Sequence, residues 1–392
     1  MAWMKPREAL KKLPEIFLHN RFTFNFDGVP IYADHLTWRK KINLLKLGVS
    51  SLLCLDHTWG LPATLQIEPT NVCNLKCPLC PAGMGTMNRR KGMMDVGTYR
   101  MILNELGDVL LAVYLYSWGE PLLNKNLLTM IEETERRHIR TLVLSNGHFL
   151  QTPEEALTFV DSGVSGFIVA VDGSTQEIYE AYRKGGDLDK VKRCVVLVEE
   201  AKARRTSPTP YTCVRTLVTS DTEEDLPHME KLARELGVKM FSYKTVGMQT
   251  YDETFKDFEP CRDDLKRFAY EHDKRKKRAS IKCPFPFRQP TVQCDGTVVG
   301  CEYDYDVEMP WGVIGEVPFK KIWNSPAAVR LRRQIRSGER GSFCRRLCPY
   351  QDRLQKSSYL SCVELQPAAE SDGLDIVIHE VPRTTPHGSD PS

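Results

Sequence analysis

The stretch Cys73-Asn-Leu-Lys-Cys77-Pro-Leu-Cys80 decides how the rest of the chain is interpreted. It directly follows a short strand-like run at 64–68, and the prolines within and around it are typical of a loop. Three thiols this close together can bind a metal centre, whereas a closed 4Fe-4S cluster or a structural zinc ion takes four protein ligands. The loop therefore predicts an iron–sulfur cluster with one iron open to a small molecule, or, as the simpler alternatives, a zinc site or unrelated free thiols.

Composition limits the remaining possibilities. The 392 residues are 41% hydrophobic, which is enough for one large α/β domain and a smaller one. The net charge is only +3, from 54 basic and 51 acidic residues, so we expect no nucleic-acid partner. Thirteen cysteines in clusters indicate thiols and metal ligands in a reducing compartment, and no apolar run is long enough to span a bilayer. We expect a cytoplasmic protein.

Six apolar runs alternate with helical patterns along the first two thirds of the chain. The strand-like runs are 64–68, 112–117, 140–144, 167–171, 212–218 and 238–243, and the helical patterns between them include 127–137, 175–183, 188–203 and 223–236. Such alternation requires parallel strands with right-handed helical crossovers. The sequence therefore predicts an α/β fold, a partial (β/α)6 TIM-like barrel with its working residues at the carboxyl ends of the strands.

Polar motifs follow the second, third and fourth runs. They are Ser117-Trp-Gly-Glu-Pro-Leu122, Ser145-Asn-Gly147 and Asp172-Gly-Ser174. Each is weak alone, because Asn-Gly and Asp-Gly are ordinary turn dipeptides. Their order after successive strands places all of them at the edge of the sheet that carries the cysteine loop.

The C-x3-C-x2-C loop together with these motifs resembles the radical S-adenosylmethionine (SAM) enzymes. The resemblance implies that Cys73, Cys77 and Cys80 hold a 4Fe-4S cluster whose fourth iron is chelated by SAM. One electron, from a flavodoxin- or ferredoxin-type donor, would cleave SAM to methionine and a 5′-deoxyadenosyl radical that abstracts hydrogen from a substrate. The same resemblance implies a SAM-binding set, in which the first three residues bind the methionine amino group and the others its carboxylate or the ribose: Gly119, Glu120, Pro121, Ser145, Asn146, Asp172 and Arg183.

A second set of cysteines begins at Cys283 and continues with Cys301, Cys344 and Cys348. Together with Gly312-Val-Ile-Gly315 and the segment from Lys321 to Arg332, it resembles the SPASM or twitch extension, a small α+β domain with auxiliary clusters. We expect these four thiolates to hold at least one auxiliary 4Fe-4S cluster, with Cys362 as a substitute ligand. The alternative is a structural zinc site with the same ligands.

These features divide the chain into five parts. They are an N-terminal helical extension (1–62), the radical SAM core (63–250), a charged linker (251–282), the auxiliary-cluster domain (283–365) and a disordered tail (366–392). The extension contains an amphipathic helix at 38–55, which we expect to cap the barrel or to pack against a partner subunit rather than to lie on a membrane. The basic run at 274–278 is expected to be a solvated part of the linker and not an RNA-binding site.

The resemblance implies an oxidoreductase in which the auxiliary cluster takes up an electron from the substrate radical. A small sugar-like or aminocyclitol-like substrate is favoured, because no segment suggests an added peptide-recognition domain. A maturase of a ribosomally made peptide is the alternative, and a non-catalytic iron–sulfur electron carrier is a further one. An oxidation needs a general base, for which the sequence offers only weak candidates: Tyr243, Lys244, Tyr303, Asp304 and Asp306.

Overall fold

The computed structural model describes residues 6–247, 253–267, 270–271, 274–275, 283–339, 341–348 and 360–365. The predicted tail and most of the basic run in the predicted linker lie outside these residues. In the described part of the linker, α10 (Glu253–Phe258) and the short strands β9 (Tyr270–Glu271) and β10 (Lys274–Arg275) are present. No helix among the described residues is both long enough and apolar enough to cross a membrane.

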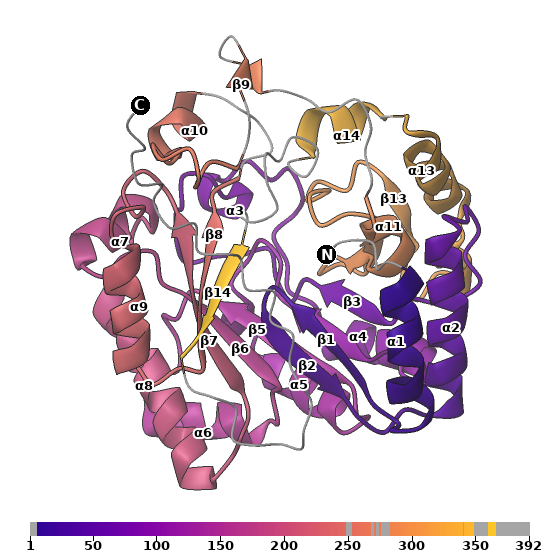
Figure 1. Ribbon diagram of the computed structural model, residues 1–392, viewed down its shortest axis with the longest axis horizontal. Coiled ribbons are helices and arrows are strands. Elements are labelled where there is room, and N and C mark those ends of the chain that lie inside the picture. Colours follow the sequence, from indigo (N-terminus) through magenta and orange to yellow (C-terminus); the bar gives the residue numbers. More distant parts are fainter. Residues whose placement is uncertain are drawn as a thin grey trace, which may run out of the picture.

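Ten strands form one sheet at the centre of the molecule (Figure 1). Its six inner strands are parallel and follow the order of the chain: β3 (Thr64–Ile67), β4 (Ala112–Leu115), β5 (Arg140–Ser145), β6 (Gly166–Ala170), β7 (Tyr211–Val218) and β8 (Met240–Thr245). Each of the six predicted runs therefore contains most of one strand. The predicted α/β fold with a mostly parallel sheet is confirmed.

Helices cover one face of this sheet: α4 (Val96–Leu106), α5 (Leu127–Glu135), α6 (Pro153–Asp161), α8 (Leu188–Arg205) and α9 (Leu226–Glu235). Because successive side chains of a strand point to opposite faces, one set packs against these helices, as Phe167 of β6 does against Phe159 of α6. The other set faces the inside of the curved sheet. Short helical segments, α3 (Pro81–Met84), the 3-10 turn η1 (Pro121–Leu123) and α7 (Gln176–Tyr182), follow the strands at their carboxyl ends.

The N-terminal extension differs from the prediction, because it is not only helical. Between α1 (Pro6–Phe17) and α2 (Trp38–Leu52) it forms a β-hairpin of β1 (Phe22–Phe26) and β2 (Val29–Ala33). Asp27 and Gly28 make the turn with positive φ of 49° and 87°, the conformation that two-residue hairpin turns favour.

The hairpin packs against the inside of the sheet and fills its amino-terminal half. Phe26 stacks on Tyr114 with ring centroids 3.9 Å apart. Val29 and Ile31 belong to the same buried cluster, which also contains inward-facing residues of five strands: Ala112, Leu142, Ile168, Cys213 and Met240. The turn at Asp27 therefore marks how far the hairpin reaches toward the carboxyl ends of the strands.

The C-terminal part joins the same sheet instead of forming a sheet of its own. It contains α11 (Phe285–Arg288), β11 (Thr291–Val292), β12 (Thr297–Val299), β13 (Pro310–Val313), α12 (Phe319–Trp323), α13 (Pro326–Ser337), α14 (Ser342–Leu347) and β14 (Leu360–Glu364). β11 pairs in parallel with β3, and β14 pairs antiparallel with β8 at the other end of the sheet. This pairing fixes the C-terminal cysteines relative to the cysteine loop, which directly follows β3.

Candidate functional site

The cysteine loop lies between β3 and α3, at the carboxyl edge of the sheet (Figure 1). Its backbone is closely covered, because a Cβ atom at Gly83 would lie 2.5 Å from both the nitrogen and the carbonyl oxygen of Cys77. Burial raises the pKa of the three loop thiols, that of Cys80 to about 11. They remain neutral unless a metal centre takes their protons, which is how thiols become ligands.

Hydrogen-bond donors surround these sulfurs. The backbone N–H of Leu75 donates to Cys73 Sγ at 3.5 Å, and Asn146 Nδ2 points at the same sulfur at 3.8 Å. Arg183 donates to Cys77 Sγ at 3.8 Å. Three donors thus point at two of the three sulfurs. Hydrogen bonds to cysteine sulfurs tune iron–sulfur clusters, so these donors fit a cluster bound by the three cysteines.

Glu120 is buried next to the loop and is bound by the motif after β5. Its carboxylate accepts hydrogen bonds from Ser145 Oγ and from the backbone N–H of Asn146, both at 2.8 Å. Burial raises its pKa to about 7, although these donors and Arg183 act in the opposite direction. A half-ionised buried carboxylate beside an open cluster suits an ammonium group.

Gly119 allows the Gly-Glu-Pro segment to approach the residues before the cysteine loop. A Cβ atom there would lie 2.1 Å from the carbonyl oxygen of Thr70, so only glycine fits. The backbone N–H of Glu120 donates to the carbonyl of Val72 at 2.8 Å, and Pro121 begins the 3-10 turn. The motif after β4 is thereby attached to the loop after β3.

Asp172 and Arg183 form a buried ion pair at the end of β6. Asp172 also accepts the backbone N–H of Leu217 at 2.6 Å, which ties β6 to β7. With its second nitrogen directed at Cys77, Arg183 places a fixed positive charge beside the loop. The structure thus brings together all ten residues that the sequence assigned to the cluster and to SAM.

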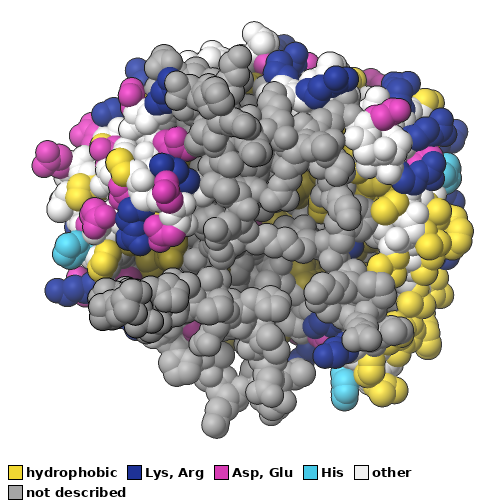
Figure 2. All heavy atoms as spheres, turned by 45° about the horizontal axis from the view of Figure 1, so that its top comes forward, with side chains coloured by type: hydrophobic (Ala, Val, Ile, Leu, Met, Phe, Trp, Pro, Cys, Tyr) yellow, Lys and Arg dark blue, Asp and Glu magenta, His cyan; other side chains and the backbone are white. Residues whose placement is uncertain are grey.

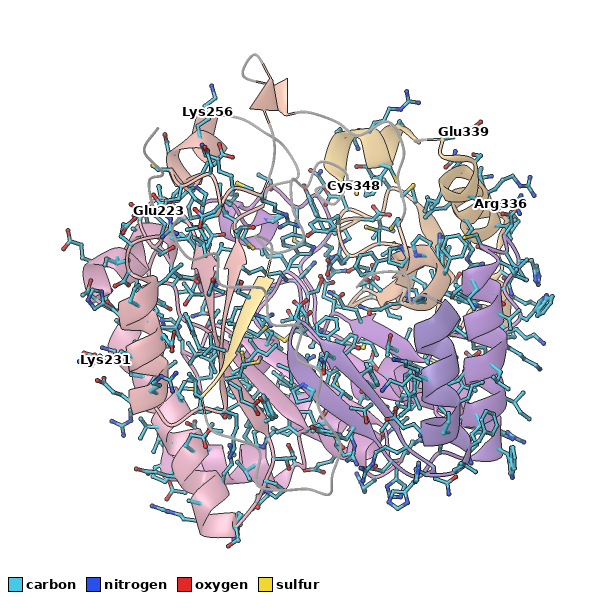
Figure 3. All side chains as sticks on the ribbon, viewed as in Figure 1. Glu223, Lys231, Lys256, Arg336, Glu339 and Cys348 are labelled. Atoms are coloured by element: carbon cyan, nitrogen blue, oxygen red, sulfur yellow. The ribbon has the colours of Figure 1, made fainter. Side chains whose placement is uncertain are left out.

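The four expected auxiliary ligands also gather in one place. The thiols of Cys348 and Cys344 are close enough to raise the pKa of Cys283, and those of Cys283 and Cys348 raise the pKa of Cys301. Figure 3 labels Cys348, which directly follows α14. It lies in the upper half of that view, where the carboxyl end of β8 also lies. Burial and these neighbouring thiols raise the pKa of Cys283 and Cys301, so these two also need a metal centre to ionise.

Among the described residues, no three His, Cys, Asp or Glu side chains are grouped as they would be around one metal ion. A 4Fe-4S cluster does not require such a group, because each thiolate binds a different iron.

Cys362 does not join the auxiliary thiols. It lies on β14 and is partnered through the sheet with Ser242 of β8. Its thiol lies against Gly28 at the hairpin turn, because a Cβ atom on Gly28 would be 2.2 Å from the Cys362 sulfur. Cys213 and Arg215 are near enough to shift the pKa of the Cys362 thiol, the first upward and the second downward. The prediction of Cys362 as a substitute ligand is therefore corrected, since β14 returns to the opposite end of the sheet from β11.

Trp118 connects the two groups of cysteines, a role that the sequence analysis did not assign. Its indole Nε1 donates to the carbonyl of Glu302 at 2.9 Å, and its carbonyl accepts from the Cys80 thiol at 3.8 Å. Its ring packs edge-on against Tyr303 and Tyr305. No local sequence signal links positions 118 and 302.

Glu68 and Arg89 make a second connection that was not predicted. Both oxygens of the buried Glu68 accept from Arg89 NH2, at 2.9 and 2.8 Å, and the backbone N–H of Cys294 donates to the same carboxylate at 3.1 Å. The end of β3, the segment after α3 and the β11–β12 turn are thus held together. Cys294 is a buried thiol.

A charged group lies on the inside of the sheet below the cysteine loop. Asp27 Oδ2 is 2.8 Å from Lys244 Nζ and 3.2 Å from Arg215 NH1. Burial alone would raise the pKa of Asp27, but the two cations outweigh it and hold the pKa below its usual range. Leu217 and Val246, each two residues further along the chain than Arg215 and Lys244, pack against the cysteine loop, so the charged group lies on the amino-terminal side of that contact.

The five candidates for the general base occupy different environments. Lys244 faces the inside of the sheet, whereas Tyr243 packs with Phe241 on the helix-covered face. Tyr303 contacts Trp118. Asp304 is buried and accepts the backbone N–H groups of Glu308 and Met309 at 2.7 and 2.9 Å, and Asp306 binds Asn88. Asp304 therefore acts as a structural residue of its loop.

Comparisons with known proteins agree with this geometry. Residues 67–233 match the radical SAM superfamily, and residues 283–349 match the SPASM iron–sulfur cluster-binding domain. The chain is 22% identical over 284 residues to the S-adenosyl-L-methionine-dependent 2-deoxy-scyllo-inosamine dehydrogenase of Niallia circulans, covering 71% of this chain and 88% of that protein. It is 27% identical to the PqqA peptide cyclase of Gluconobacter oxydans over 45% of this chain and 47% of that protein.

A solved structure shares the fold. The structure of Streptococcus suis SuiB bound to S-adenosylmethionine superposes with a TM-score of 0.57 at 14% identity, covering 83% of this chain and 78% of that chain. The two matched domains imply a 4Fe-4S cluster that binds SAM and an auxiliary cluster. The chain is a radical SAM enzyme with a C-terminal SPASM domain.

Proposed function

We propose that this chain is an oxidoreductase that uses SAM to oxidise a small molecule held on the inside of the sheet. When bound, the cluster and SAM would supply a 5′-deoxyadenosyl group able to accept one hydrogen atom from the substrate, and an auxiliary cluster would supply an acceptor for one further electron as a proton leaves. The substrate thereby loses two electrons and two protons in total. The residues of this chain bind, orient and shield the reacting groups.

The observation that carries the proposal is the convergence of three strand ends on the cysteine loop. Asn146 after β5 points at Cys73, Arg183 after β6 points at Cys77, and Glu120 after β4 binds Ser145 and Asn146. We assign Cys73, Cys77 and Cys80 as the cluster ligands on this basis.

Charge suggests how SAM would lie. Glu120 and the backbone of Gly119 and Pro121 would take its amino group, and Arg183, oriented by Asp172, would take its carboxylate. Ser145 would keep the Glu120 carboxylate turned toward the ligand. These roles match in charge: the Glu120 carboxylate would face the ammonium group of SAM, and the Arg183 guanidinium would face its carboxylate.

Cys283, Cys301, Cys344 and Cys348 would hold the auxiliary cluster. Trp118 supports this assignment, because its indole binds the carbonyl of Glu302 beside Cys301, and Glu120, two residues further on, binds the carbonyl of Val72 beside Cys73. A flavodoxin- or ferredoxin-type protein would supply the first electron to the cluster in the cysteine loop.

The hairpin favours a small substrate over a long one. It occupies the amino-terminal half of the inner space, so a substrate reaches only from the cysteine loop down to Asp27. Asp27, Arg215 and Lys244 would meet it there with hydrogen bonds suited to hydroxyl and amino groups. The dehydrogenase from Niallia circulans, of which 88% is matched, is named for an aminocyclitol of this chemistry.

Maturation of a ribosomally made peptide is the second candidate. It is supported by the similarity to PqqA peptide cyclase over about half of that protein. Under this alternative a single side chain of the peptide would enter the space above Asp27.

Deuterium transfer distinguishes the two candidates. The anaerobically reconstituted full chain is incubated with SAM, dithionite and uniformly deuterated aminocyclitols or sugars, and 5′-deoxyadenosine is analysed by mass spectrometry. The proposal expects deuterium in 5′-deoxyadenosine from at least one of these compounds, and loss of the transfer in Asp27→Ala while SAM binding persists. Transfer from a deuterated precursor peptide alone would overturn it.

A further inference from the structure

Helix α2 is oriented with its apolar side toward solvent. Its large exposed side chains follow a helical spacing of three or four residues: Trp38 (68% exposed), Ile42 (47%), Leu45 (41%), Val49 (38%) and Leu52 (41%). Positions with this spacing form one continuous stripe along a helix. A surface helix ordinarily turns such a stripe toward the core.

The buried side of the same helix is largely polar. It contains Lys40, Lys41, Asn43, Ser50 and Ser51, with Leu47 as the apolar exception. Lys40 Nζ donates to the carbonyl of His138 at 3.1 Å, and Asn43 exchanges two hydrogen bonds with the backbone of Leu61 at 2.9 and 2.8 Å. Specific polar contacts therefore fix the orientation, and rotating the helix to bury its stripe would break them.

Neighbouring segments extend the stripe into a patch, which we define as Leu18, Trp38, Ile42, Leu45, Val49, Leu52, Leu53 and Trp59. Figure 2 shows contiguous hydrophobic atoms on the right-hand side of the molecule, where α2 runs in Figure 1. Exposed apolar patches of this kind mark interaction surfaces. Tryptophans lie toward both ends of the patch, as is typical of helices at a membrane–water interface.

The charges around the patch are positive. α2 carries four basic residues and no acidic one, and of the four Arg39 and Lys46 are exposed beside the stripe. Arg333 and Arg336 border its carboxyl end, where both pair with Asp56, and Figure 3 labels Arg336 at this edge.

A basic pocket opens at the first turn of α2. The cavity of about 570 Å³ is lined by Lys40 and Arg137, by the rings of His35 and His138, and by the carboxylate of Asp108, which pairs with Arg39. The pocket lies at the same end of α2 as Trp38, but Lys40, which lines it, belongs to the buried side of the helix.

We propose, contrary to the expectation from the sequence, that the patch binds the surface of a phospholipid bilayer with anionic headgroups. The apolar stripe would enter the boundary between headgroups and acyl chains, while the exposed Arg39 and Lys46 face the headgroups. A second copy of the chain fits less well, because two facing α2 helices would bring together basic residues without an acidic residue on either helix. This binding would place the enzyme beside the membrane without spanning it.

Vesicle sedimentation of the anaerobically reconstituted full chain tests the proposal. We expect binding to vesicles of phosphatidylcholine and phosphatidylglycerol, and weaker binding to phosphatidylcholine alone. Ile42→Ser/Leu45→Ser should reduce binding by at least about tenfold on either vesicle, because two apolar side chains no longer enter the bilayer. Arg39→Gln/Lys46→Gln should reduce it about fivefold only where anionic lipid is present, an effect that high salt removes.

Val196→Ser/Val317→Ser is the matched control, because it replaces two apolar residues of similar exposure outside the patch. It should bind as the wild type does. The proposal is wrong if the wild type binds neither vesicle, or if the control loses as much binding as the patch variant. Light scattering shows whether a second copy covers the patch instead. The proposal is also wrong if the wild type binds no vesicles and forms a dimer that Ile42→Ser/Leu45→Ser dissociates.

Discussion

Trp118 Nε1 donates a hydrogen bond of 2.9 Å to the carbonyl oxygen of Glu302, although the two residues are 184 positions apart in the chain. Glu302 directly follows Cys301, and Glu120, two residues after Trp118, is attached to the carbonyl of Val72 beside the cysteine loop. The indole hydrogen bond therefore helps to hold the auxiliary cysteines at a set distance from the cysteine loop. Electron transfer between two metal centres depends on that spacing, so Trp118 is expected to act as a positioning residue.

Trp118→Phe should keep the ring contacts and lose the hydrogen bond to Glu302. We expect a loss of about 1 kcal/mol in the free energy of unfolding, since the partly buried hydrogen bond to Glu302 is removed. The electron paramagnetic resonance signal of the auxiliary cluster should change, while the signal of the cluster in the cysteine loop persists. Trp59→Phe, at an exposed tryptophan, should change neither. Identical spectra for Trp118→Phe and the wild type would contradict the positioning role.

Glu120 should make SAM binding depend on pH. Its carboxyl group has a pKa raised to about 7, so it is ionised above that pH and increasingly neutral below it. If the ionised form attracts the SAM amino group, affinity should fall about tenfold per pH unit below pH 7. Glu120→Gln should bind weakly at every pH, and Glu177→Gln, on an exposed part of α7, should behave as the wild type. A wild-type pH profile in Glu120→Gln, measured by equilibrium dialysis, would rule out this role.

Two glycine substitutions should have opposite effects. In Gly119→Ala the added Cβ would lie 2.1 Å from the carbonyl oxygen of Thr70, so we expect a loss of about 1–3 kcal/mol in unfolding free energy together with weaker SAM binding. Gly48→Ala lies in α2 with no atom within 4 Å of the new Cβ, and should gain about 0.5–1 kcal/mol. Denaturant unfolding measures both. Equal stability of Gly119→Ala and the wild type would show that the close contact between Gly119 and the carbonyl of Thr70 is not required.

Asp27 and Lys244 should be energetically coupled. Their 2.8 Å ion pair is mostly buried, so Asp27→Ala leaves Lys244 and Arg215 beside each other without that carboxylate. A double-mutant cycle with Lys244→Ala should give a coupling energy of about 1–2 kcal/mol. Because the cations lower the pKa of Asp27, its contribution should persist down to about pH 4 and disappear only below it. Additive effects of the two substitutions would argue against the pair.

The central strands and the site motifs could be predicted because their signals are local. Each strand is a short apolar run, and the polar motif after it lies at the carboxyl edge by the geometry of parallel strands. The sequence also contains a local signal for the hairpin, because Asp27-Gly28 between two apolar runs is typical of a two-residue hairpin turn.

Other features depend on contacts between distant segments. The orientation of α2 is set by partners such as His138 and Leu61, so its sequence pattern predicts a stripe but not the side that is buried. The contacts of Trp118 with Glu302, and of Glu68 with Arg89, likewise arise only in the folded chain. The cysteine spacing of the C-terminal set left Cys362 as a substitute ligand, and only the path of β14 removes it.

The most direct test of the account measures iron and SAM cleavage in the same samples. Anaerobically reconstituted wild type, the triple variant Cys73→Ala/Cys77→Ala/Cys80→Ala and the control Cys261→Ala, an exposed cysteine, are reduced with dithionite and supplied with SAM. We expect about eight irons in the wild type and in the control, with 5′-deoxyadenosine formed by both, and about four irons and no 5′-deoxyadenosine in the triple variant. A fully loaded wild type that forms no 5′-deoxyadenosine, or a triple variant that still forms it, would contradict the account.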